Sequence, residues 1–169
     1  MYHQCYDSRA RMAPKPPPLD VSIVIAAPIG RVIRAFFDAQ AIAAWWHAAR
    51  SVTAPRMLGP YVIEWAPTDF SDDLLGRLGG IFRGTVMHFE PAHGFFVADA
   101  FWLPPDTDPI GPMALEVACT PVDQDSVAAT HVRVTQTGFE ESDRWRRYYE
   151  IVGPGWERAL NSMKALIEK

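Results

Sequence analysis

Apolar and polar residues alternate in seven segments of the chain. In the first of them Val21, Ile23 and Ile25 occupy every second position, which is the period of a strand with one buried face. Glycine- and proline-rich stretches separate the segments and predict turns. The seven candidate strands span 19–25, 51–54, 60–66, 81–90, 94–102, 112–120 and 128–137.

Two short helices are expected directly after the first strand. Pro28 suits the first turn of a helix, and Val32 and Ala35 follow it at helical spacing, so the pattern predicts a helix over 28–37. A second short helix, at about 40–47, ends in a pair of tryptophans.

The last part of the chain has the period of one long amphipathic helix, from about 142 to 168. At 1.5 Å per residue it would be roughly 40 Å long. Its apolar positions follow steps of three and four: Trp145, Tyr149, Val152, Trp156, Leu160, Met163 and Ile167. The sequence Gly153-Pro154-Gly155 predicts a kink or a restart, because proline removes one hydrogen bond of the helix.

This order of elements indicates an α+β domain. Consecutive strands with short links pair antiparallel, and one face of such a sheet needs a cover. We expect a curved antiparallel sheet of six or seven strands around the terminal helix, the helix-grip arrangement. In the long connection 67–80 we expect a helical turn, with Ser71 as its N-cap and Gly76 after its end.

The 169 residues correspond to one domain, with 49% hydrophobic and 21% charged residues. We expect a disordered, proline-rich leader over 1–18 and the folded domain over 19–169. A net charge of −4 argues against a nucleic-acid partner. No apolar run reaches membrane-spanning length, so no membrane partner is expected. Cys5 and Cys119 make no disulfide framework, which favours a cytoplasmic location.

The chain resembles the START-like, Bet v I-like superfamily, also called SRPBCC, and within it the branch named for the activator of the heat-shock-protein-90 ATPase. Four pieces spread over 19–169 carry the likeness. They are Val24-Ile25-Ala26-Ala27-Pro28 with Val32 and Phe36; Trp45-Trp46; Arg83-Gly84-Thr85-Val86 with Phe89-Glu90-Pro91; and Thr135-Gln136-Thr137-Gly138-Phe139 with Gly155-Trp156, Leu160 and Leu166.

The resemblance implies one of three functions. The first is non-catalytic binding of a small apolar or aromatic molecule between the sheet and the last helix. The second is a cyclase, dehydratase or hydrolase in the same cavity. The third is a co-chaperone-like protein-interaction role, which is weaker because the chain has no second module to clamp a large partner. The connections 67–80 and 103–112 are long, so the ligand class does not carry over.

The sequence contains no recognisable catalytic or metal motif. No two histidines have the spacing of a zinc hydrolase, and no Gly-x-Ser-x-Gly elbow is present. We therefore expect no metal, no other cofactor and no catalytic residue. Glu64 and Asp99 lie in predicted strands and could act as an acid or base if burial raised their pKa, but the solvated face of the sheet is the default for both.

An apolar cavity between sheet and helix is the expected site. Bulky rings are numerous for one domain, and a helix gripped by a sheet leaves space that such rings can line. We chose the strand faces that keep Arg83, Asp99 and Arg133 out of the interior. Gln136 would be a polar handle among apolar neighbours. The predicted lining is Trp46, Trp65, Phe82, Gly84, Trp102, Val134, Gln136, Trp156 and Leu160.

An apolar strip on the outer face of the sheet is also expected. Strict alternation places Phe101 opposite to Trp102, beside Phe95 and Val97. Exposed strips of this kind mark interfaces, so this strip predicts a homodimer.

Deleting 1–18 should leave the melting temperature nearly unchanged, because a polar, proline-rich segment buries little apolar surface. Thermal unfolding of the full and truncated chains measures the difference. A drop of more than several degrees would show that the leader packs on the domain or on a partner subunit.

Overall fold

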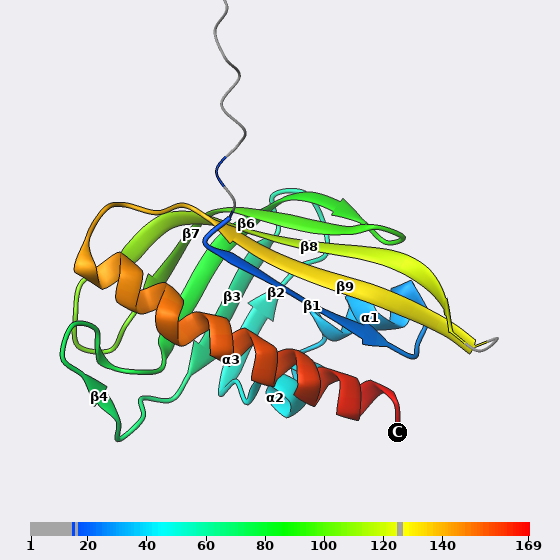
Figure 1. The fold of residues 1–169 in the computed structure, drawn as a ribbon, viewed down its shortest axis with the longest axis horizontal. Helices are drawn as coiled ribbons and strands as arrows, with labels where there is room; N and C mark the ends of the chain where they lie inside the picture. The colour runs from blue at the N-terminus through cyan, green and yellow to red at the C-terminus, as the bar shows by residue number, and fades with distance from the viewer. Residues whose placement is uncertain (1–14, 16, 125–126) are drawn as a thin grey trace, which may run out of the picture.

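The computed structural model describes residues 15, 17–124 and 127–169. Its elements confirm the expected α+β fold (Figure 1). They are β1 (Leu19–Ile25), α1 (Ile29–Ala35), α2 (Ala39–Trp46), β2 (Arg50–Thr53), β3 (Pro60–Trp65), β4 (Ser71–Asp72), β5 (Gly76–Arg77), β6 (Gly80–Glu90), β7 (Gly94–Leu103), β8 (Ile110–Gln124), β9 (Val127–Thr137) and α3 (Asp143–Ile167).

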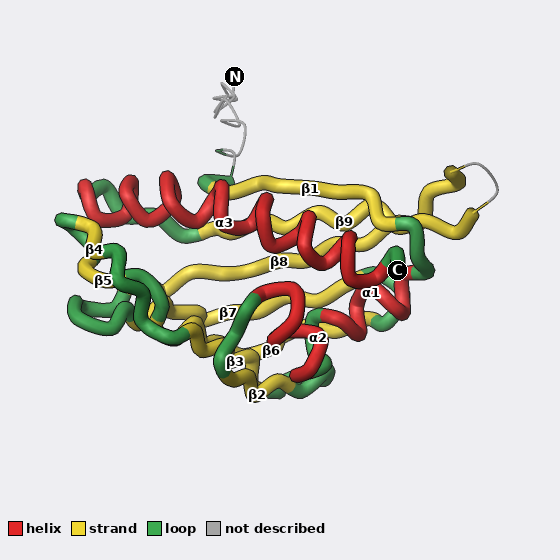
Figure 2. Tube along the Cα trace, turned by 90° about the horizontal axis from the view of Figure 1, so that it is seen from below, coloured by secondary structure: helices red, strands yellow, loops and turns green. Residues whose placement is uncertain are grey.

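The main sheet has seven strands in the order β1-β9-β8-β7-β6-β3-β2, and every neighbouring pair is antiparallel. Helix α3 runs across one face of this sheet, and α1 and α2 lie on the same side near the C-terminal half of α3 (Figures 1 and 2). Among the described residues, no helix lies on the opposite face of the sheet (Figure 2). This arrangement places the buried stripe of α3 against the apolar face of the strands.

Helix α3 is one continuous helix. Its N-cap, Ser142, accepts a hydrogen bond from the backbone N–H of Trp145 at 3.2 Å. The predicted restart at Gly153-Pro154-Gly155 is wrong, since the helix runs from Asp143 to Ile167 with Pro154 inside it. Pro154 lies on the exposed side, so the carbonyl group that lacks a helical donor can be solvated there.

The connection 67–80 forms a small hairpin, which we call the cap. Strands β4 and β5 pair within it, so the predicted helical turn with Ser71 as N-cap is wrong. Asp72 organises the turn instead, because its Oδ1 accepts the backbone N–H groups of Leu74 and Leu75 at 2.9 and 3.1 Å. Gly76, at φ 73°, provides the left-handed residue that the turn needs.

A bulge in β7 overturns the predicted apolar strip. Asp99 has a φ of 50°, and the register between β7 and β8 shifts between Val97 and Ala100. Phe95 and Val97 therefore point into the core, with 2% and 0% exposure, on the same face as Trp102. The homodimer remains a prediction, without this strip to support it.

Further expectations concern the leader, the cysteines and membrane association. Most of the predicted leader, including Cys5, lies outside the described residues. Cys119 is a buried free thiol, and burial raises its pKa to about 12. Among the described helices none is both long and apolar enough to cross a membrane.

Replacing Gly153 by alanine should stabilise the protein. Gly153 lies inside α3, and a Cβ there would meet no atom within 4 Å. Alanine favours a helix interior over glycine by about 1 kcal/mol, which corresponds to a rise of about 2–4 °C in melting temperature. Gly94→Ala is the contrasting control, because its Cβ would collide with the carbonyl oxygen of Val117. A lower melting temperature for Gly153→Ala would contradict a continuous helix.

Candidate functional site

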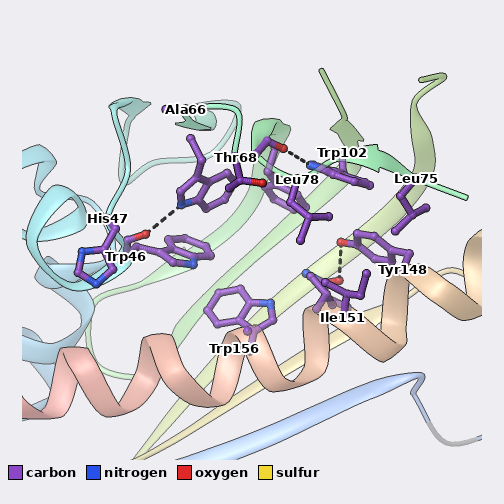
Figure 3. A pocket seen from close by; sticks show the side chains of 16 residues that line it. Trp46, His47, Ala66, Thr68, Leu75, Leu78, Trp102, Tyr148, Ile151 and Trp156 are labelled. Atoms are coloured by element: carbon purple, nitrogen blue, oxygen red, sulfur yellow. Dashed lines mark hydrogen bonds between the residues drawn. The ribbon is translucent and has the colours of Figure 1, made fainter. Parts of the chain in front are cut away.

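A cavity of about 430 Å³ lies beneath the middle of α3. The sheet, α2, α3 and the cap all contribute to its walls (Figure 3). The lining consists of Trp46, His47, Trp65, Ala66, Thr68, Leu75, Leu78, Gly79, Phe82, Trp102, Gln136, Tyr148, Ile151, Val152, Gly155 and Trp156. His47, Ala66 and Thr68 are exposed residues and mark the rim.

Three tryptophans from different elements form one end of the cavity. The Trp46 ring lies 4.5 Å from the Trp156 ring and 5.1 Å from the Trp65 ring, measured between centroids. Trp65 Nε1 donates a hydrogen bond to the backbone oxygen of Trp46 at 2.9 Å (Figure 3). This bond ties α2 to β3 and orients the Trp65 indole. The wall is therefore preformed by contacts within the protein.

The opposite end is formed by Trp102, Phe82 and Tyr148. Trp102 Nε1 donates to the backbone oxygen of Gly79 at 2.8 Å, which joins β7 to the cap (Figure 3). Phe82 is the β6 partner of Trp102, and the Tyr148 ring lies 5.7 Å from the Trp102 ring. These rings make the cavity surface predominantly apolar.

A buried polar pair lies between β9 and α3. The Tyr148 hydroxyl donates to Gln136 Oε1 at 3.1 Å (Figure 3). The same hydroxyl lies 3.3 Å from the sulfur of Met113. Gln136 is 2% exposed and Tyr148 is 4% exposed. Burial raises the pKa of Tyr148 far above its ordinary value, so the hydroxyl stays protonated and serves as a donor.

The cap closes one side of the cavity, because Leu75 and Leu78 line it. Besides the Trp102 bond to Gly79, the contacts that attach this hairpin to the rest of the domain include an ion pair between Arg77 and Asp106 at 2.8 Å. Arg147 Nε of α3 donates to Asp72 Oδ2 at 2.6 Å, and the Thr107 hydroxyl donates to the backbone oxygen of Leu75 at 2.8 Å. The Arg147 guanidinium holds the pKa of the Asp72 carboxyl below its usual value, and backbone donors act in the same direction.

A family model for the activator of Hsp90 ATPase homolog 1-like proteins, AHSA1, matches residues 26–168. The chain belongs to the AHSA1 family. This membership agrees with the expected START-like superfamily and its AHSA-type branch.

Solved structures share the fold of this AHSA1 domain. Protein MLL2253 from Mesorhizobium loti is 22% identical, with a TM-score of 0.62 over 88% of this chain and 96% of that one. A protein from Rhodobacter sphaeroides is 14% identical, with a TM-score of 0.61 over 91% and 96%. CalU16 from Micromonospora echinospora is 16% identical, with a TM-score of 0.53 over 88% and 74%. A search of curated proteins found no match.

The AHSA1 cavity contains many of the side chains that the sequence indicated. Trp46, Trp65, Phe82, Trp102, Gln136 and Trp156 line it, whereas Gly84, Val134 and Leu160 do not. Val134 and Leu160 are fully buried in the core, and Leu160 borders a separate hollow against β1. A Cβ at Gly84 would collide with the side chain of Val97, so that position is filled by β7.

Other lining residues of the AHSA1 cavity were not anticipated. Sequence spacing placed Tyr149 on the apolar stripe of the last helix, whereas the structure buries Tyr148 and leaves Tyr149 half-buried. Tyr149 instead donates its hydroxyl to the backbone oxygen of Gly138 at 2.6 Å. Leu75 and Leu78 had no periodic signal because they lie in the irregular cap.

The two carboxylates considered as acid or base lie outside the AHSA1 cavity. Glu64 pairs with Arg50 at 2.6 Å, and Asp99 is exposed at the bulge of β7. In the part of the chain that the structure describes, no group of three His, Cys, Asp or Glu side chains could hold a metal ion.

The Asp72→Asn variant should lose part of the acid sensitivity of the domain. Because the folded-state pKa of Asp72 is lowered, its carboxylate stabilises the fold above the ordinary aspartate pKa of about 3.9, and this contribution disappears as the pH falls through the folded pKa. Asparagine keeps an oxygen for the N–H groups of Leu74 and Leu75 but carries no charge.

Melting temperatures of both proteins between pH 7 and pH 2.5 check this prediction. The parent should be the more stable at neutral pH, and the difference should shrink toward acid. A difference that does not change with pH would show that the Asp72 charge contributes nothing to stability.

Proposed function

We propose that this AHSA1 domain binds a small apolar or aromatic molecule in the cavity beneath α3 without transforming it. The observation that carries the proposal is a preformed cavity of about 430 Å³ walled by indole rings. Small-molecule sites have volumes of roughly 300–1,000 Å³ and are mostly apolar with a few placed polar groups. Gln136 and Tyr148 supply such groups here.

The side chains around the cavity favour binding over catalysis. In the described chain the lining includes no carboxylate, lysine, arginine or cysteine. Its titratable side chains are His47, at the exposed rim, and Tyr148, whose pKa burial raises well out of the working range. General acid–base catalysis needs a group whose pKa lies near the operating pH. Away from the rim residue His47, the lining therefore supplies no side chain suited to the acid–base steps of a cyclase, dehydratase or hydrolase.

Filling the cavity from α3 should weaken binding. Gly155 lines the cavity, and a Cβ there would meet no atom within 4 Å, so Gly155→Leu places a side chain into open space. The neutral dye N-phenyl-1-naphthylamine is a suitable probe, read by its own emission and by quenching of tryptophan fluorescence. The leucine side chain should displace apolar contacts of the dye worth roughly 1.5–3 kcal/mol. The dye should therefore bind about tenfold more weakly, or weaker still.

Gly153→Leu is the matched control, because Gly153 lies on the same helix and equally tolerates a Cβ but does not line the cavity. Its dye affinity should stay within about twofold of the parent's. Equal dye affinity in the parent and in Gly155→Leu would contradict binding at this cavity.

A further inference from the structure

Two buried side chains of the cavity lining carry a hydrogen-bond donor that has no acceptor within the described part of the protein. Gln136 uses its Oε1 to accept from Tyr148, and no bond is formed by its amide nitrogen Nε2. Trp156 Nε1 likewise has no partner, in contrast to Trp65 and Trp102, whose indole N–H groups donate to backbone oxygens.

Both unpaired donors face the cavity. Among the described residues, every completely buried side-chain nitrogen or oxygen has a hydrogen-bond partner. Because Gln136 Nε2 and Trp156 Nε1 have none, neither atom is completely buried. Gln136 is 2% exposed and Trp156 is 3% exposed, and both line the cavity. The space that reaches their N–H groups is therefore the interior of the cavity.

Tyr148 sets the direction of the Gln136 amide. Its protonated hydroxyl donates to Oε1 at 3.1 Å, which occupies the acceptor side of the amide (Figure 3). The NH₂ side is left for a ligand. An amide that donates while its oxygen is occupied recognises an acceptor.

We propose, on the basis of the binding function above, that the ligand is a neutral aromatic molecule whose carbonyl oxygen accepts a hydrogen bond from Gln136 Nε2. A ketone, quinone or lactone has the required chemistry. Trp156 Nε1 is a second donor for the same class of ligand. The aromatic walls contact the rings of the ligand, and the donors select its oxygen.

Charged ligands fit this cavity poorly. A carboxylate would be desolvated without a lining lysine or arginine to compensate, and a buried unpaired charge is expensive. An ammonium group would be attracted by the indole faces, but the unpaired N–H donors would repel it and the lining offers no carboxylate to neutralise its charge. A pure hydrocarbon would bind but would leave both donors unpaired.

Fluorene and 9-fluorenone test the proposal, because they share one tricyclic skeleton and differ by a carbonyl group. Titration calorimetry of the parent protein should give an affinity about two- to tenfold higher for 9-fluorenone, the range of one net hydrogen bond. Gln136→Met keeps an unbranched side chain of similar length and should remove this preference while retaining fluorene binding. Thr137→Met, an exposed neighbour on β9, should retain the preference.

The outcomes separate this inference from the proposed function. Equal affinities of the parent for both tricycles, or an unchanged preference in Gln136→Met, would overturn carbonyl selection and leave apolar binding standing. Tighter binding of the ammonium form of 9-aminofluorene than of 9-fluorenone would also overturn carbonyl selection. If neither tricycle binds the parent, the inference and the binding function both fail. Should Gln136→Met not fold, Trp156→Phe keeps an aromatic wall and should reduce the carbonyl preference.

Discussion

The packing of α3 against the curved sheet determines where the protein can hold a ligand. The helix is sealed against the sheet toward its C-terminal end by Leu160, Met163 and Ile167, which are buried. Between this sealed part and Tyr148 the helix presents the buried Trp156 ring beside Gly155 and half-buried aliphatic residues. A side chain as small as glycine cannot reach the strands, so rings from α2, β3 and β7 enclose the remaining space. The cavity is a consequence of uneven packing along one helix.

The sequence was sufficient to predict the fold because the hydrophobic periods of strands and helices differ. The order of the predicted strands and helices along the chain is informative as well. Alternation identifies strands and steps of three and four identify helices, independently of distant contacts. The bulge at Asp99 escaped this reasoning, since one extra residue reverses the phase of a strand without leaving a local mark. The cap escaped it too, because a two-residue strand is too short to have a period and depends on contacts such as Asp72 with Arg147.

Predicting which side chains border a cavity is harder than predicting which face is buried. Periodicity assigned both Trp156 and Leu160 to the inner stripe of α3, and both are buried. Only Trp156 borders the cavity, because the elements opposite the two residues differ. Gly84 shows the same limit on a strand, where the side chain of Val97 fills the space that the glycine leaves. Whether a buried side chain borders the cavity depends on the element packed opposite it. The pattern of a single strand or helix carries no information about that element.

The walls and the cap of the cavity are held by interactions of different character. Indole N–H bonds to backbone oxygens orient Trp65 and Trp102, and these short bonds are largely shielded from water. The ionic contacts of the cap involve side chains nearer the surface, where water and salt weaken them. Arg147, its ionic link to α3, is itself partly exposed. The Trp102 bond ends on Gly79 of the cap, so the cap is held both by a shielded bond to a wall residue and by these more exposed ionic contacts, and raising the salt concentration weakens only the second kind.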